Sequence, residues 1–314
     1  MIMGHVPFGS DGVGFIKWIH GFHMPLFFVI SGYFYTQYSF SSVLKKRIQS
    51  LLIPYFVFGT AFLCINWLIQ KKIEFGDVGI LFFENTAGYG IPLGGALWFL
   101  TAAFFADIIY AIIDRIGNSI AVACIIILIS LLGMISAALL PLRLPYGLDA
   151  ALVGVGLIHI GRILRNKLPK VFNLGLFQSL LIAVISSALI MVNGYVNLRT
   201  GKYGNWILFW INSVGMTIAL WNIARYIDFL MIRFKMSKIL NWIHNIGHDS
   251  IVFLCVNQFA IYVTAKIIWH FGRNLIGGLN VILLNTVILI FVLIETYIFR
   301  NIIIKFRLTK LIGR

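Results

Sequence analysis

Apolar runs of about 20 residues, the length of one helical crossing of a membrane, recur along the chain between short polar breaks. The pattern predicts nine such helices, at residues 20–39, 51–70, 96–113, 119–140, 148–164, 174–194, 204–224, 249–271 and 276–299. No break between them is long enough for a separate soluble domain. We therefore expect residues 1–314 to form one integral membrane domain of the all-α class, a polytopic transmembrane helix bundle.

Composition supports this interpretation. Hydrophobic residues make up 60% of the chain and charged residues 11%, against about 25% charged residues in an average soluble protein. A soluble fold would expose much of this apolar surface as adhesive patches, so we expect membrane lipid to surround it. The three cysteines lie inside apolar runs and have neither a disulfide pattern nor metal-ligand spacing.

Charge is informative by its position along the chain. Of the 25 lysines and arginines, 17 lie in the breaks 40–50, 114–118, 165–173 and 225–248, in the tail after 299, or at Arg162. These segments alternate as nine spans require, and cytoplasmic loops are enriched in Lys and Arg. The basic balance therefore predicts a multi-pass protein of the cell membrane with a cytoplasmic C-terminus, and no nucleic acid partner.

The same alternation places residues 1–19 outside the cell. Residues 1–8 have the character of the last turns of an earlier helix. We therefore expect a truncated first span here, with a tenth span upstream of Met1 in the native chain.

Histidines are concentrated near the N-terminus, where His5, His20 and His23 lie within 19 residues. Ionisable groups in a membrane are costly and are functional candidates for that reason, and imidazole suits proton transfer near neutral pH. We take His5 and His23 as candidate catalytic bases and favour His20 less. The alternative is that His20 and His23 are interfacial side chains with one hydrated edge.

Five motifs follow one another in a fixed order along residues 5–258. They are His5-Val6-Pro7 with Phe22–Tyr33 (FHMPLFFVISGY), then Lys46–Tyr55 (KRIQSLLIPY), Ala96–Leu100 (ALWFL), Tyr203–Phe209 (YGNWILF) and Ile246–Ile251 (IGHDSI). In this order they resemble acyltransferase family 3, a family of integral membrane O-acyltransferases acting on glycans.

The resemblance implies about ten spans and an acyl-CoA-dependent enzyme. Such an enzyme moves an acyl group, usually acetyl from cytosolic acetyl-CoA, to a hydroxyl of a cell-surface or lipid-linked sugar. It implies a general base at His5, which matches the histidine of the family's Arg-x10-His motif. It also implies O-acetylation of a polysaccharide or similar glycan, with the acyl-CoA as donor substrate and no permanently bound cofactor.

The chain departs from the family pattern at three places. The arginine eleven residues before His5 is not in this sequence, Ser50 replaces the second arginine of an Arg-x-x-Arg motif, and Asn257 stands where many members have histidine. We expect Lys45, Lys46 and Arg47 to bind the CoA phosphates, the alternative being a plain positive-inside anchor. Trp98, Asn257 and Gln258 are the candidate substrate-binding residues, as donors to the oxyanion or to the sugar.

Three other interpretations remain open. A small-solute or glycan transporter fits the number of spans, although no inverted repeat or matched pair of broken helices is visible. A catalytically inactive relative is possible because the upstream arginine is missing. Asp107, His159 and Glu295 are expected to pair with Arg115, Arg162 or Arg300, the alternative being that Asp107 or Glu295 lines a donor entrance. His244 and His248 lack the further ligands of a zinc site, so no metal is expected.

Overall fold

The computed structural model describes residues 2–6, 13–72, 76–84, 90–140, 143–272 and 281–313. Over these residues the chain is helical and has no strand, apart from an isolated bridge between Asn197 and Lys202. The predicted all-α class is therefore confirmed. Of the segment 1–8, expected to end an earlier helix, residues 2–4 form one 3-10 turn (η1, Ile2–Gly4), and residues 7 and 8 lie outside the described part.

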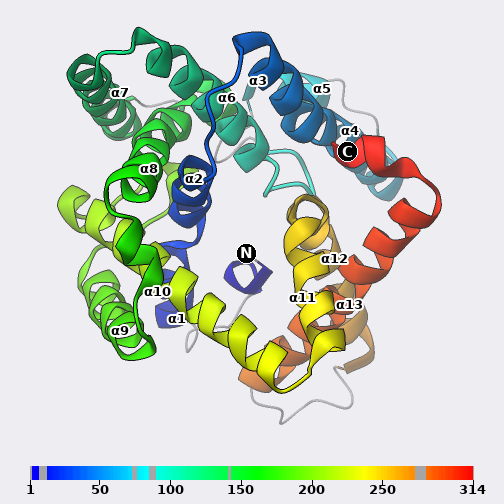
Figure 1. The fold of residues 1–314 in the computed structure, drawn as a ribbon. Coiled ribbons are helices and arrows are strands. Elements are labelled where there is room, and N and C mark those ends of the chain that lie inside the picture. The colour runs from blue at the N-terminus through cyan, green and yellow to red at the C-terminus, as the bar shows by residue number, and fades with distance from the viewer. Residues whose placement is uncertain are drawn as a thin grey trace.

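The longer elements follow the predicted order (Figure 1). They are α1 Val13–His20, α2 His23–Tyr33, α3 Phe40–Arg47, α4 Ile53–Gln70, α5 Gly76–Gly79, α6 Trp98–Ile113, α7 Ser119–Leu139, α8 Leu148–Lys167, α9 Leu176–Val192, α10 Trp206–Arg233, α11 Ser237–His248, α12 Ser250–Gly272 and α13 Val281–Lys305. The chain also contains short 3-10 turns, among them η9 at Leu308–Ile312 and η8 at Leu198–Thr200, which carries a residue of the site described below.

Seven helical stretches in the described residues are long and apolar enough to cross a membrane. They correspond to seven of the nine predicted spans. The other two predicted spans are the shorter helices α6 and α9. A membrane-embedded helix bundle is thus supported, whereas a count of nine or ten spans is not confirmed.

The helix predicted at residues 51–70 begins earlier, at Phe40. Ser39 caps a helix by accepting a hydrogen bond from the Ser42 backbone N–H, and α3 then continues through a π-helical turn at Ile48–Leu52 into α4. Lysine and arginine are good helix formers, so a charged stretch can extend a span beyond the apolar region. Lys45, Lys46 and Arg47 consequently lie on a helix rather than on a loop.

The helix predicted at residues 204–224 extends further, and a second helix lies between it and the next span. Helix α10 continues to Arg233, and α11 follows after a turn. No residue of α11 is buried, and Ile239, Trp242 and Ile243 are exposed on it. A helix that combines such residues with lysines is typical of a membrane–water interface. The polar residues that suggested a loop form one face of this helix.

Helix α2 is packed against α8 at an unusually close crossing. A Cβ on Gly32 of α2 would overlap the Ile158 carbonyl oxygen of α8, and a Cβ on Gly161 of α8 would overlap the Val29 carbonyl oxygen of α2. Small residues allow helix backbones in membranes to approach in this way. The two reciprocal glycines therefore fix the position of α2, which carries candidate site residues.

The helices form a ring in which α2 and α12 face each other across the interior (Figure 1). The turn η1 lies inside the ring and packs against α1, α12 and α13. This position explains how His5, which directly follows η1, reaches side chains of α12 more than 250 residues away. The fold thus brings the N-terminal histidines to the centre of the bundle.

Candidate active site

His20 uses both of its ring nitrogens for structural hydrogen bonds. Its Nε2 lies 3.1 Å from the Gly4 carbonyl oxygen, and its Nδ1 lies 2.8 Å from the Tyr195 hydroxyl. A carbonyl oxygen only accepts, so Nε2–H donates to Gly4 and Nδ1 accepts from Tyr195. His20 therefore holds η1 in place and has no free nitrogen for proton transfer.

His23, the first residue of α2, has one free nitrogen. Its Nδ1 lies 2.9 Å from the Ile19 carbonyl oxygen and must donate to it. Its ring is centred 5.1 Å from the His20 ring, and that ring is 6.3 Å from the His5 ring. The three histidines thus form one cluster, in which Nε2 of His23 can accept a proton.

His5 is bound to α12 through Gln258. The Gln258 amide nitrogen lies 3.2 Å from His5 Nδ1. In this orientation the amide donates to Nδ1, and the proton of the neutral ring is on Nε2. If the amide is turned over, its oxygen accepts from Nδ1–H and leaves Nε2 of His5 free to act as a base. The orientation of one amide therefore decides which chemistry His5 can perform.

Burial, together with the neighbouring His20 and Arg199, lowers the pKa of His5, which precedes the first candidate span, to about 4. The ring is therefore neutral at physiological pH. A neutral imidazole is the form that a general base requires.

The Gln258 amide oxygen and the Arg199 guanidinium both lie close to the backbone of Gly95. A Cβ on Gly95 would overlap the Gln258 amide oxygen and would lie 3.0 Å from Nη1 of Arg199. Arg199 belongs to η8, in the segment that also carries Tyr195. The absence of a side chain at Gly95 thus allows Gln258 and Arg199 to approach the same point.

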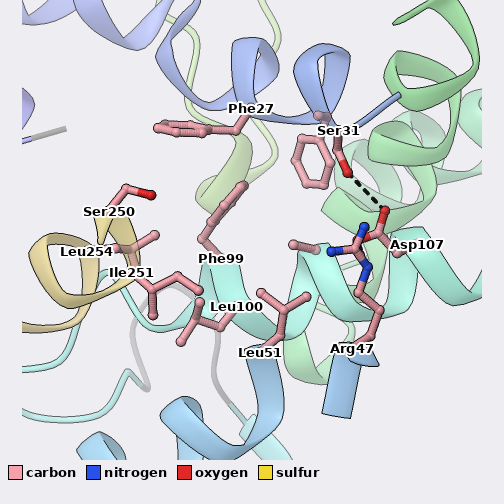
Figure 2. Close-up of a pocket in the computed structure, with 12 residues that line it drawn as sticks. Phe27, Ser31, Arg47, Leu51, Phe99, Leu100, Asp107, Ser250, Ile251 and Leu254 are labelled. Carbon is pink, nitrogen blue, oxygen red and sulfur yellow. Dashed lines mark hydrogen bonds and ion pairs between the residues drawn. The ribbon is translucent and has the colours of Figure 1, made fainter. Parts of the chain in front are cut away.

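A cavity of about 170 Å³ lies deeper in the bundle (Figure 2). Phe27 and Ser31 of α2 point into it from one side, and Leu254 with its neighbours on α12 lines the facing wall. Arg47 and Asp107 lie together at one end. Most of the wall is apolar, so the cavity suits an apolar group with a few polar atoms.

Arg47 and Asp107 form an ion pair between this inner cavity and a second one. Arg47 Nε lies 2.9 Å from Asp107 Oδ2, and the Ser31 hydroxyl donates to Asp107 Oδ1 at 3.1 Å. The second space, of about 350 Å³, is called here the vestibule. It is lined by Phe34, Tyr35, Thr36, Tyr38, Ser42, Val43, Lys46, Arg47 and Asp107. Because both spaces are lined by Arg47 and Asp107, the ion pair lies at their boundary.

Three helical stripes connect the histidine cluster with this ion pair. Residues spaced by four lie on one helix face. The stripes are His23, Phe27 and Ser31 on α2, Gln258, Leu254 and Ser250 on α12, and Phe99, Ala103 and Asp107 on α6. Eight residues cover about 12 Å along a helix. The site therefore extends from the histidines through the inner cavity to the vestibule. We call the residues of these three stripes the central column.

The remaining sequence-predicted site residues lie apart from His5. Asn257 is fully buried and donates to the Leu254 carbonyl of its own helix, while its side-chain oxygen has no partner in the described structure. Trp98 packs near Gly147 at the start of α8 and has no described contact with His5 or Gln258. Their roles in substrate binding stay predictions.

Only part of the predicted phosphate-binding cluster, Lys45, Lys46 and Arg47, lines the vestibule. Lys45 and Lys46 are exposed, and Lys46 lines the vestibule together with Arg47. The structure thus brings two of the three predicted phosphate-binding residues to one space. No motif in the sequence marks Arg199, Tyr195 or Gly95 as site residues.

The partners expected for Asp107, His159 and Glu295 are wrong. Asp107 pairs with Arg47, and the Glu295 carboxylate accepts from the Thr264 hydroxyl. His159 bonds to the Tyr110 hydroxyl, while Arg162 pairs with Asp114 and Arg300 with Asp249. The expected partners stand close in sequence, but helix packing brings together residues of different helices. No group of three metal-ligand side chains is found in the described part of the chain.

Comparison with known proteins gives one match. The acyltransferase domain model of acyltransferase family 3 matches residues 1–300. Searches of curated protein sequences and of solved structures returned no match. The match extends over nearly the whole chain, including every helix of the central column. The chain therefore belongs to acyltransferase family 3.

Proposed function

We propose that this protein is a membrane O-acyltransferase that moves a short acyl group from acyl-CoA to a sugar hydroxyl on the other side of the cell membrane. The observation that supports this best is the central column. It joins a basic vestibule at Lys46 and Arg47 to the histidine cluster through an apolar cavity.

The vestibule suits the donor nucleotide. Lys46 and Arg47 can pair with phosphate oxygens, and charge-assisted hydrogen bonds of this kind are the strong ones. By the distribution of lysine and arginine this end faces the cytoplasm, where acyl-CoA is made. The C-terminus, at the same end, is then also cytoplasmic.

The inner cavity suits a short acyl chain. A cavity of about 150 Å³ holds a molecule the size of benzene, and the inner cavity measures about 170 Å³. This space is large enough for an acetyl group and the adjoining thioester. Acetyl is therefore the proposed group.

The chemistry needs one base and one route for protons. Nε2 of His5 takes the proton of the sugar hydroxyl as the hydroxyl oxygen attacks the thioester carbonyl carbon. A carbon–oxygen bond forms, the carbon–sulfur bond breaks, and the proton passes from His5 to the CoA thiolate. Gln258 supports this role when its amide oxygen accepts from Nδ1–H, and His23 is the alternative base.

The test is acyl transfer by membranes that contain the full-length native protein, supplied with acetyl-CoA labelled on the acetyl group. We expect label in surface glycan with the wild type and with His244→Ala, and its loss with His5→Ala at equal expression. His244 is the matched control because it is exposed and pairs with Asp228.

The other outcomes are equally informative. Retention of label in His5→Ala with loss in His23→Ala would transfer the role of base to His23. Absence of label with folded wild-type protein would contradict the proposal and favour a transporter or an inactive relative.

A further inference from the structure

Among the described residues, Arg199 has no counter-charge, unlike four other arginines that face the interior. Arg47, Arg143, Arg162 and Arg300 each pair with an aspartate. Within the described residues the Arg199 side chain has no hydrogen bond or ion pair, and its Nε is buried without a partner. Arg199 is half-buried, and partial burial of a cation without a counter-charge is unfavourable, so an anion bound beside it would stabilise it.

Contacts of the surrounding segment hold the backbone of Arg199 in place. It lies in η8, where the Asn197 side chain accepts from the Thr200 backbone N–H and Leu198 is buried. Tyr195, in the same segment, bonds to His20. The guanidinium is therefore held beside Gly95 and Gln258, next to His5.

Electrostatics agrees with this placement. Burial lowers the pKa of Arg199, although an arginine stays charged at any physiological pH. The charge of Arg199 lowers the pKa of His5. An anion bound at Arg199 would cancel this effect, and His5 would become a stronger base.

We propose that Arg199 is the specificity-determining residue for the acceptor and binds a sugar that carries a carboxylate or a phosphate. This inference rests on the proposed function. The segment 193–205 lies at the histidine end of the central column, opposite the donor vestibule, so the ligand of Arg199 arrives with the acceptor. The Gln258 amide oxygen occupies the point beside Gly95 that Arg199 also approaches, and the ligand's anionic group takes the place of this oxygen when the amide turns.

Binding of the acceptor also orients Gln258. An anion beside Gly95 accepts hydrogen bonds from Arg199 and from the Gln258 amide nitrogen. The amide oxygen of Gln258 then faces His5 and accepts from Nδ1–H, which leaves Nε2 of His5 free as the base. The acceptor thus selects the catalytic form of His5.

The first arm of the test measures binding without any acyl transfer. Detergent-solubilised protein is heated with methyl glucuronide, glucose 1-phosphate or methyl glucoside, since a ligand of the native state raises the melting temperature. We expect stabilisation by a charged sugar at concentrations at least about tenfold lower than by the neutral one, because charge pairing dominates such sites. The carboxylate and phosphate probes distinguish the two sources of negative charge.

Variants identify the residue responsible. Arg199→Gln should abolish the preference for the charged sugar, and Arg199→Lys should keep part of it. Lys202→Gln is the matched control, because it removes a cation from an exposed position of the same segment. Equal binding of neutral and charged sugars by the wild type would overturn the inference even if Arg199→Gln did not fold.

The second arm measures transfer from labelled acetyl-CoA to the same sugars. We expect Arg199→Gln to raise KM for the charged acceptor and to leave KM for acetyl-CoA unchanged. An equal fall of kcat for all acceptors, with KM unchanged, would instead assign Arg199 to oxyanion stabilisation. If no sugar is acylated but charged sugars still bind through Arg199, the proposed function fails while the inferred anion site stands.

Discussion

Arg47 Nε lies 2.9 Å from Asp107 Oδ2, at the boundary between the vestibule and the inner cavity. Asp107→Asn removes the charge but keeps the shape of the side chain, so Arg47 loses the group that orients it. We expect KM for acetyl-CoA to rise about three- to tenfold, the effect of losing roughly 1 kcal/mol of positioning. KM for the acceptor should not change.

Asp114→Asn is the matched control for this measurement. The buried carboxylate of Asp114 also pairs with an arginine, Arg162, but Asp114 lines a different space. An equal rise of the donor KM in both variants would show a general loss of structure rather than a role in donor binding.

Gln258 is predicted to orient His5. Gln258→Leu removes the partner of His5 Nδ1, and we expect kcat to fall about 10- to 100-fold, part of the contribution of general-base catalysis. Gln258→Glu should retain kcat, since a carboxylate accepts from Nδ1–H and fixes the same tautomer, but it should raise KM for a charged acceptor, because the carboxylate repels the anion and cannot donate to it. Single-turnover acyl transfer measures both.

Asn257→Leu provides the comparison at the neighbouring position. The Asn257 amide donates to its own helix, so its removal should affect kcat far less than Gln258→Leu. A larger loss in Asn257→Leu would mean that the sugar or the oxyanion binds at Asn257.

The pH dependence of transfer follows from the pKa of His5, which burial lowers to about 4. The neutral ring is the active form and persists until the pH approaches that value. We therefore expect the rate to hold as pH falls from 8 to 5.5. A base with an ordinary pKa of about 6.5 would be only about one tenth neutral at pH 5.5, so a tenfold fall of the rate between pH 7.5 and 5.5 would contradict the assignment of His5.

The α2–α8 crossing is predicted to be sensitive to a single methyl group. Gly161→Ala would place Cβ against the Val29 carbonyl oxygen, and we expect a loss of about 1–3 kcal/mol of stability from overpacking. Gly247→Ala on α11 is the control, because its Cβ would meet nothing within 4 Å. That substitution should be neutral or stabilise by up to about 1 kcal/mol. Thermal unfolding in detergent compares the two, and equal melting temperatures would contradict the close crossing.

Hydropathy was sufficient to predict the positions of most helices, because lipid requires long apolar stretches with internally satisfied backbone groups. It failed where helices continue into polar sequence. Lys45–Arg47 and the polar face of α11 were interpreted as loops, although charged residues favour helices as readily as many apolar ones.

The site was only partly predictable. The histidines and Gln258 were found through motifs, but no local signal indicates that His5 and Gln258 touch. Nothing in the sequence around Arg199 distinguishes it from other arginines between helices. Its distinguishing property, the lack of a counter-charge among the described residues, exists only in the folded structure. Asp107 was assigned to the wrong arginine because its true partner comes from a helix 60 residues earlier in the chain.

The reciprocal contact of Gly32 and Gly161 has a consequence for the permeability of the membrane. Backbones that touch at two points cannot tilt or slide past each other without losing that contact, whereas carriers that work by alternating access depend on such movements. The wall that carries His23, Phe27 and Ser31 is therefore rigid. We expect side chains, chiefly Arg47, to move when the donor enters. Under the proposed function, the nucleotide would stay on one side and the sugar on the other, and only the acyl group would cross, so turnover need not open a leak for ions.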